Sequence, residues 1–157
     1  MTAVVPRTAS ASPAEALVCR NCEARYPLGA QHACFECFGP LEIGYDAAAL
    51  ASVTREQIEA GPHSLWRYAG LLPAGHDPAT RVDSGTGMTP LIRADKLGEA
   101  LGFTAPLWVK DDSGNPTHSF KDRVVSVAIT AARELGFTRI ACASTGNLAN
   151  AVAAAAA

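Results

Sequence analysis

The sequence lacks an excess of basic residues, a long apolar run and an export signal. Its formal net charge of -2 offers no basic stripe for phosphate groups, so a nucleic-acid partner is not expected. No apolar stretch reaches the roughly 18 residues that a membrane-spanning helix requires. Residues 1–16 have no continuous apolar core of the secretory type and predict a disordered tail. These absences favour a cytoplasmic protein with no membrane partner.

A stop signal is also missing after the last helical pattern. The chain ends inside the alanine-rich run Ala151–Ala157, with no glycine, proline or polar residue to terminate a helix. We therefore expect the chain to be the front part of a longer polypeptide.

Four of the five cysteines form two C-x-x-C pairs with eleven residues between them. These cysteines are Cys19, Cys22, Cys34 and Cys37. The spacing lets two knuckles face each other and present four thiolates to zinc, and Gly39 supplies permissive backbone for such a turn. We predict a structural zinc-ribbon-like module over residues 17–45, with a redox pair, a disulfide set and a metal-free knuckle as alternatives. His32 is expected in an exposed loop and Cys142 as a buried, inert thiol.

Residues 46–83 predict a helical linker and entry region, with a helix over Thr54–Glu59 that Gly61 and Pro62 end. An apolar group in this region is expected to pack inside the protein. It consists of Leu65, Trp66, Tyr68, Leu71 and Leu72.

Residues 84–157 alternate between helical and strand patterns, which is typical of an α/β domain. The expected elements are a helix over Asp95–Leu101, a strand over Leu107–Lys110, a helix over Phe120–Leu135 and a strand over Arg139–Ser144. Gly102 and Gly136 follow the two helices. This order predicts two parallel strands joined by a crossover helix.

Lys121 is the residue that the sequence marks most clearly as functional. It lies in the run Asn115–Arg123 (NPTHSFKDR), which leaves a strand and enters a helix. The helix dipole disfavours an ammonium at this end, which leaves more free amine to form an imine with an aldehyde. An exposed lysine on an ordinary helix would explain the same local spacing.

A second polar segment, Ser144–Asn147 (STGN), follows the next predicted strand and precedes another helix. Hydroxyls, backbone amides and the Asn147 amide would gather there, at the end of the sheet where α/β proteins bind ligands. Ser and Thr before a helix are also ordinary caps.

NPTHSFKDR followed by STGN resembles the active-site lysine and asparagine-loop motifs of the threonine synthase family. These are pyridoxal-phosphate enzymes of fold type II, the tryptophan-synthase β-like fold. Gly87–Leu91 resembles the family's Thr-Pro-Leu entry segment, and Leu107–Asp112 is similar to the strand before the lysine loop. A four-cysteine ribbon precedes the catalytic domain in some relatives. His118 stands where many relatives have glycine, which leaves the loop's shape and any catalytic part for His118 open.

The resemblance implies that Lys121 forms the imine with pyridoxal phosphate and later shuttles protons. It also implies that Asn147 contacts the cofactor's 3'-oxygen, and that Ser144 and Thr145 grip the substrate carboxylate. The implied reaction converts O-phospho-L-homoserine and water to L-threonine and phosphate, with the cofactor ring as electron sink. Lys110 has two possible roles: it lines the substrate phosphate site, or it is structural. A homodimer is compatible with the resemblance.

Two alternatives stay open. Another fold-type-II lyase, such as a threonine dehydratase or a cysteate synthase, would share the lysine motif. A noncatalytic zinc-ribbon interaction module would explain the cysteines without any chemistry. Whether the chain belongs to a threonine synthase or to another fold-type-II lyase, residues 1–157 by themselves are expected to bind the cofactor weakly and to have no catalytic activity.

Overall fold

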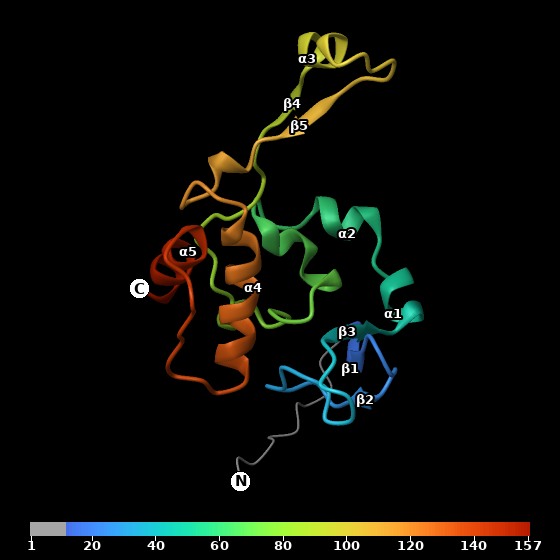
Figure 1. Ribbon diagram of the computed structural model, residues 1–157, viewed down its shortest axis with the longest axis vertical. Helices are drawn as coiled ribbons and strands as arrows, with labels where there is room; N and C mark the ends of the chain where they lie inside the picture. Colours follow the sequence, from blue (N-terminus) through green and yellow to red (C-terminus); the bar gives the residue numbers. More distant parts are fainter. Residues whose placement is uncertain (1–11) are drawn as a thin grey trace.

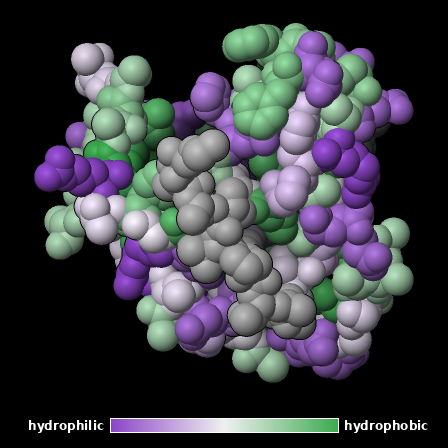
Figure 2. All heavy atoms as spheres, turned by 90° about the horizontal axis from the view of Figure 1, so that it is seen from below, coloured by the Kyte–Doolittle hydropathy of each residue, from purple (hydrophilic) through white to green (hydrophobic). Residues whose placement is uncertain are grey.

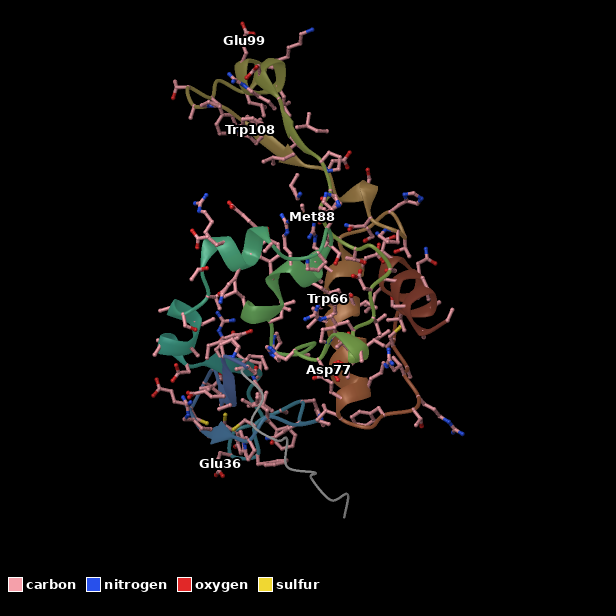
Figure 3. The ribbon with its side chains drawn as sticks, turned by 180° about the vertical axis from the view of Figure 1, so that it is seen from behind. Glu36, Trp66, Asp77, Met88, Glu99 and Trp108 are labelled. Atoms are coloured by element: carbon pink, nitrogen blue, oxygen red, sulfur yellow. The ribbon has the colours of Figure 1, made fainter. Side chains whose placement is uncertain are left out.

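A computed structural model describes residues 12–157 of the chain. Figure 1 shows a small sheet at one end, a helical body in the middle and a two-stranded arm that projects from the other end. Figure 3 shows Glu36 near the sheet end, Trp66 in the body, and Glu99 and Trp108 on the arm. Most of the predicted tail, residues 1–11, lies outside the described residues.

The small sheet has three antiparallel strands in the order β2-β1-β3. The strands are β1 (Ala14–Cys19), β2 (Arg25–Tyr26) and β3 (Leu41–Tyr45). Strand β1 begins inside the segment predicted as a tail because Ala14 and Ala16 are buried as β1 pairs with β3. Leu17, also buried, lies opposite Tyr26 on one side and Ile43 on the other. The strand expected at residues 41–43 is confirmed.

Short helices connect this sheet to the body. They are α1 (Ala47–Ala51), α2 (Arg55–Glu59) and the 3-10 helices η1 (Leu65–Leu71) and η2 (Pro78–Thr80). The start of α2 is fixed by a capping box, in which Thr54 and Gln57 each accept a hydrogen bond from the other's backbone N–H. The predicted apolar group is only partly correct: Trp66 is 1% exposed, whereas Tyr68 is 41% exposed.

The arm consists of β4 (Leu91–Arg93), α3 (Asp95–Ala100) and β5 (Trp108–Lys110). The strands pair antiparallel, with Leu91 opposite Lys110 and Arg93 opposite Trp108. The predicted helix and strand are confirmed here, and Gly102 follows α3 with a left-handed φ of 73°. Met88 lies where the arm joins the body (Figure 3).

The body is built on α4 (Lys121–Glu134) and α5 (Asn147–Ala156), which pack side by side (Figure 1). Val125 and Ile129 of α4 and Ala151 of α5 form the buried cluster, with Val82 against it. Val82 is also held by its backbone, since its N–H donates to Thr130 Oγ1 at 2.9 Å and its carbonyl accepts from Trp66 Nε1 at 3.2 Å. The first bond attaches the extended segment before the arm to α4, and the second attaches it to η1.

The predicted parallel pair is not confirmed in the described part of the chain. Strand β5 pairs antiparallel with β4 in the arm, and Arg139–Ser144 forms no strand. A strand exists through hydrogen bonds to a neighbour, and within residues 12–157 no strand lies alongside this segment. Cys142 is therefore exposed, and its prediction as a buried thiol is wrong for this structure.

Much apolar surface remains outside the buried cluster. Val124 on α4 is 54% exposed, and Phe137 and Ile140 after it are similarly open beside a groove between α4 and α5. On the sheet end of the molecule, Figure 2 shows hydrophobic residues interleaved with hydrophilic ones. No helix within residues 12–157 has the length and apolar character to cross a membrane.

Candidate active site and four-cysteine centre

The four paired cysteines meet at one point beside the small sheet. Their Sγ atoms lie within 4.8 Å of one another, and Cys19 and Cys37 are separated by 3.5 Å. A tetrahedron with Zn–S bonds of about 2.3 Å places its sulfurs about 3.8 Å apart, close to this spacing. All four are free thiols, with Cys19 and Cys34 buried and Cys22 and Cys37 exposed. The donor set therefore fits a zinc ion.

The two C-x-x-C turns repeat the same backbone geometry. Their hydrogen bonds correspond pair by pair: Cys19 N to Ala24 O (2.8 Å) and Cys34 N to Gly39 O (2.9 Å), then Glu23 N to Cys19 O (3.0 Å) and Phe38 N to Cys34 O (3.1 Å). Glu23 and Phe38 follow the second cysteine of each pair, and both have a left-handed φ, 62° and 58°. In each turn a backbone N–H also points at the first sulfur, from Asn21 at 3.4 Å and from Glu36 at 3.3 Å. This repetition is the geometry of two facing knuckles.

Gly39 is required at the second knuckle, but for a reason that differs from the prediction. The left-handed backbone belongs to Phe38. A Cβ on Gly39 would lie 3.0 Å from Cys19 Sγ and 2.8 Å from Asn21 Nδ2. Gly39 therefore lets the second knuckle approach the sulfur of the first.

The hydroxyl of Tyr26 also contacts the cluster. Its oxygen lies 3.1 Å from Cys34 Sγ, and this hydrogen bond is the largest of several, including those from the backbone of Cys37 and Glu36, that lower the pKa of the Cys34 thiol to about 6. A lowered pKa favours the thiolate, which is the form that binds metal. Sequence spacing alone did not single out Tyr26.

The lysine loop is anchored by buried polar side chains. Asn115 is 2% exposed; its Oδ1 accepts from Gly87 N at 3.0 Å and its Nδ2 donates to Asp112 O at 3.1 Å. Asp122, 5% exposed, accepts from Thr117 N at 2.8 Å and from Thr117 Oγ1 at 2.7 Å. These bonds fix the loop to the entry segment at one end and to α4 at the other.

Lys121 is the first residue of α4, which agrees with the helix N-terminus predicted from the sequence. Its backbone N–H donates to the buried Ser119 Oγ at 3.2 Å. Its side chain is half-buried, with Nζ 4.4 Å from the centroid of the Phe120 ring. The amine is thus held at the start of a helix by a rigid loop.

His118 occupies a left-handed backbone position, with a φ of 59°. Glycine adopts this conformation without strain, which explains why glycine suits the place, and any other residue there costs about 1–3 kcal/mol. His118 Nδ1 lies 3.0 Å from the carbonyl oxygen of Ser113 and stabilises the same loop. The loop therefore keeps a glycine-like shape, and a catalytic part for His118 stays untested.

An ion pair between Asp112 and Arg123 connects three segments of the chain. Asp112 accepts from Arg123 Nε at 2.8 Å and from Arg123 Nη2 at 2.7 Å, and Thr89 Oγ1 donates to the same carboxylate at 2.6 Å. The Arg123 hydrogen bond holds the pKa of Asp112 well below its usual range and raises that of Arg123. Lys110 Nζ contacts the Thr89 carbonyl oxygen. In this structure Lys110 thus takes the structural role, and Arg123 pairs with Asp112 and not with its neighbour Asp122.

The second polar segment lies at the start of α5. Ser144 Oγ accepts from Gly146 N at 3.3 Å, while Thr145 and Asn147 are exposed. Helix packing brings α5 against the helix that Lys121 begins, but no hydrogen bond among residues 12–157 joins Lys121 to this segment. The structure therefore packs against each other the two helices that begin at the two motifs.

Residues 82–157 match the family model described as pyridoxal-phosphate dependent enzyme. The match contains Lys121 and the segment Ser144–Asn147. It begins at Val82, in the extended segment that is hydrogen-bonded to α4. The C-terminal part of the chain, from Val82 on, is therefore similar to that enzyme class.

More specific likeness comes from curated relatives. Threonine synthase of Methanosarcina acetivorans is 40% identical over 138 residues, which cover 87% of this chain and 33% of the relative. Threonine synthase of Methanocaldococcus jannaschii is 42% identical over 120 residues, or 76% of this chain and 29% of the relative. The chain therefore spans about a third of the length of these relatives. No solved structure matches it. The resemblance to threonine synthases is confirmed.

Proposed function

We propose that this chain is the lysine-bearing part of a threonine synthase, which converts O-phospho-L-homoserine and water to L-threonine and phosphate. The observation that carries the proposal is Lys121 at the start of α4, inside the segment that matches the pyridoxal-phosphate dependent enzyme family. Identity of 40% and 42% to two threonine synthases supports this choice of reaction.

The described residues include a primary amine that suits the aldehyde group of such a cofactor. Lys121 supplies a primary amine, and the buried Asn115 and Ser119 hold its loop. When bound, pyridoxal phosphate supplies an electron sink for carbanions next to the substrate nitrogen. In our proposal Lys121 binds the cofactor aldehyde covalently and afterwards moves protons on the substrate carbons.

Ser144, Thr145 and Asn147 have supporting roles in the proposal. The start of α5 presents free backbone N–H groups and two hydroxyls, which suit a carboxylate. We assign Ser144 and Thr145 to the substrate carboxylate and Asn147 to the cofactor's 3'-oxygen.

The central experiment compares the complete protein with its Lys121→Ala variant. We expect the wild type to gain visible absorbance with added pyridoxal phosphate and to release phosphate from O-phosphohomoserine, and the variant to do neither, because the amine is lost. Lys96→Ala, on the exposed helix α3, is a matched control that should behave as the wild type. A wild type without absorbance or phosphate release, or a Lys121→Ala variant equal to it, would contradict the proposal.

The same experiment separates the nearest alternative. A threonine dehydratase would share the lysine motif and the absorbance, but it would deaminate threonine and leave phosphohomoserine intact. A cysteate synthase would likewise need the lysine without making threonine. Product analysis with each substrate therefore distinguishes the reactions.

We further propose that Cys19, Cys22, Cys34 and Cys37 hold a structural zinc ion. The support is the convergence of four thiols in two equivalent knuckles. Four protein ligands fill a tetrahedral site, so this ion would stabilise the fold and take no part in the reaction. A cytoplasmic location and a homodimer remain predictions from the sequence.

A further inference from the structure

The two knuckles are equivalent in their backbones but differ in one side-chain contact. Tyr26 lies seven residues after Cys19, and the corresponding position seven residues after Cys34 is Leu41. Tyr26 places its hydroxyl 3.1 Å from Cys34 Sγ. Leu41 pairs with Cys19 in the sheet and has no polar group to offer. Cys34 therefore has a hydroxyl partner that Cys19 lacks.

The neighbouring backbone determines the direction of this hydrogen bond. Phe35 N donates to the Tyr26 oxygen at 3.1 Å, so the oxygen acts as acceptor toward the backbone and its own proton is free for the sulfur. The Tyr26 ring is also fixed, by an edge contact with Phe35 at 5.6 Å between centroids. Because Glu36 N donates to Cys34 Sγ as well, this sulfur receives two hydrogen bonds from rigid donors.

We propose that Tyr26 is a positioning residue for the metal centre, and that its hydroxyl holds Cys34 as the slowest ligand to leave a bound zinc ion. This inference depends on the four-thiolate site proposed above and not on the proposed reaction. Four thiolates around Zn²⁺ carry a net charge of about -2, and hydrogen bonds to the sulfurs spread that charge. Outer partners of this kind typically change metal affinity about 10–100-fold.

The test uses the zinc-loaded protein and its Tyr26→Phe variant. This variant removes the hydroxyl and keeps the ring that packs on Phe35. We expect zinc transfer to an excess of chromophoric chelator to become about tenfold faster. With cobalt(II) in place of zinc, the sulfur-to-cobalt absorption should move to longer wavelength, because a sulfur without its hydrogen bond gives up electron density more easily.

Tyr45→Phe is the matched control. Tyr45 is also half-buried in the same sheet, but it pairs with Ala14 at the end opposite Cys19. It should release zinc at the wild-type rate with an unchanged cobalt spectrum. A Tyr26→Phe variant equal to wild type in both measurements would overturn the inference alone. A wild type that binds no zinc would overturn the metal site with it, and neither result touches the lyase proposal.

Discussion

At the scale of single residues, the pair of Asp112 and Arg123 holds the base of the lysine loop. Its side chains are 22% and 29% exposed, so the ion pair is partly shielded from water. We predict that Asp112→Asn lowers the free energy of unfolding by about 2 kcal/mol, because Arg123 loses its charged partner and one of the two acceptor oxygens is replaced by an NH2 group that can only donate. Asp95→Asn is the control, since Asp95 pairs with Arg93 but is 65% exposed. It should cost less than about 0.5 kcal/mol in the same denaturation experiment.

The pH dependence of stability follows from the direction of the Asp112 pKa shift. Its pKa is lower in the folded protein than in the unfolded chain, because Arg123 favours the carboxylate. The stabilisation is therefore complete above the unfolded pKa of about 4 and is lost as the pH falls below it. Asp112→Asn should flatten the wild-type decline below about pH 4. An equal decline in both proteins would contradict the role of this pair.

Single residues also show what the sequence can and cannot predict. The convergence of four thiols was predictable because each C-x-x-C turn is local, and its spacing fixes the geometry of two ligands at once. The partner of Arg123 was not predictable, because Asp122 is its neighbour in sequence, whereas Asp112 reaches it only in the folded loop. Tyr26 gave no local signal for the same reason: its contact with Cys34 requires two knuckles to face each other.

At the scale of elements, α4 is attached to the extended segment at Val82 through two hydroxyls: Ser126 Oγ donates to the Val82 carbonyl oxygen, and Thr130 Oγ1 accepts from the Val82 N–H. Thr130 is fully buried, accepts from Val82 N at 2.9 Å and donates to Ser126 O at 2.8 Å. Thr130→Val keeps the shape and removes the acceptor, which leaves the partly buried backbone N–H of Val82 without this partner. We predict a loss of about 1–3 kcal/mol in unfolding free energy, measured by urea denaturation.

Thr138→Val is the control for this prediction. Thr138 lies in the exposed segment after α4, where the hydroxyl is open to water. The same chemical change should therefore have little effect. If the two variants lose equal stability, the hydrogen bond to Val82 does not anchor the segment.

The same helix explains why elements were predicted better than their surroundings. The helical spacing and Gly136 place α4 correctly because they depend on neighbours in sequence. The apolar positions Phe120, Val124 and Leu135 are largely exposed, and the buried face carries Val125, Ser126 and Thr130 instead. The buried face of α4 is the one against which other elements pack, and these are α5 and the extended segment at Val82. The parallel strand expected at Arg139–Ser144 failed for a related reason, since its pairing partner is not specified by its own sequence.

At the scale of the whole molecule, the small sheet and the helical body depend on different sources of stability. In the sheet, Cys19 and Cys34 are among the few buried side chains, so a metal would supply much of what a larger core supplies elsewhere. The buried cluster of the body, Val125, Ile129 and Ala151, contains no metal ligand. Figure 1 shows the two parts at different places along the molecule. We therefore expect zinc removal to act locally.

Hydrogen exchange of the zinc-loaded protein before and after chelation measures this directly. Amides of β1 and β3 should lose protection because the knuckles that close the sheet come apart, while amides of α4 should keep theirs. Cys34→Ser should reproduce the effect of the chelator, since it removes one buried ligand. Cys142→Ser, which changes an exposed thiol outside the cluster, should leave the pattern unchanged. Loss of protection in α4 together with β1 would instead mean that the metal centre stabilises the lysine-bearing helix as well, and that the two parts unfold as one cooperative unit.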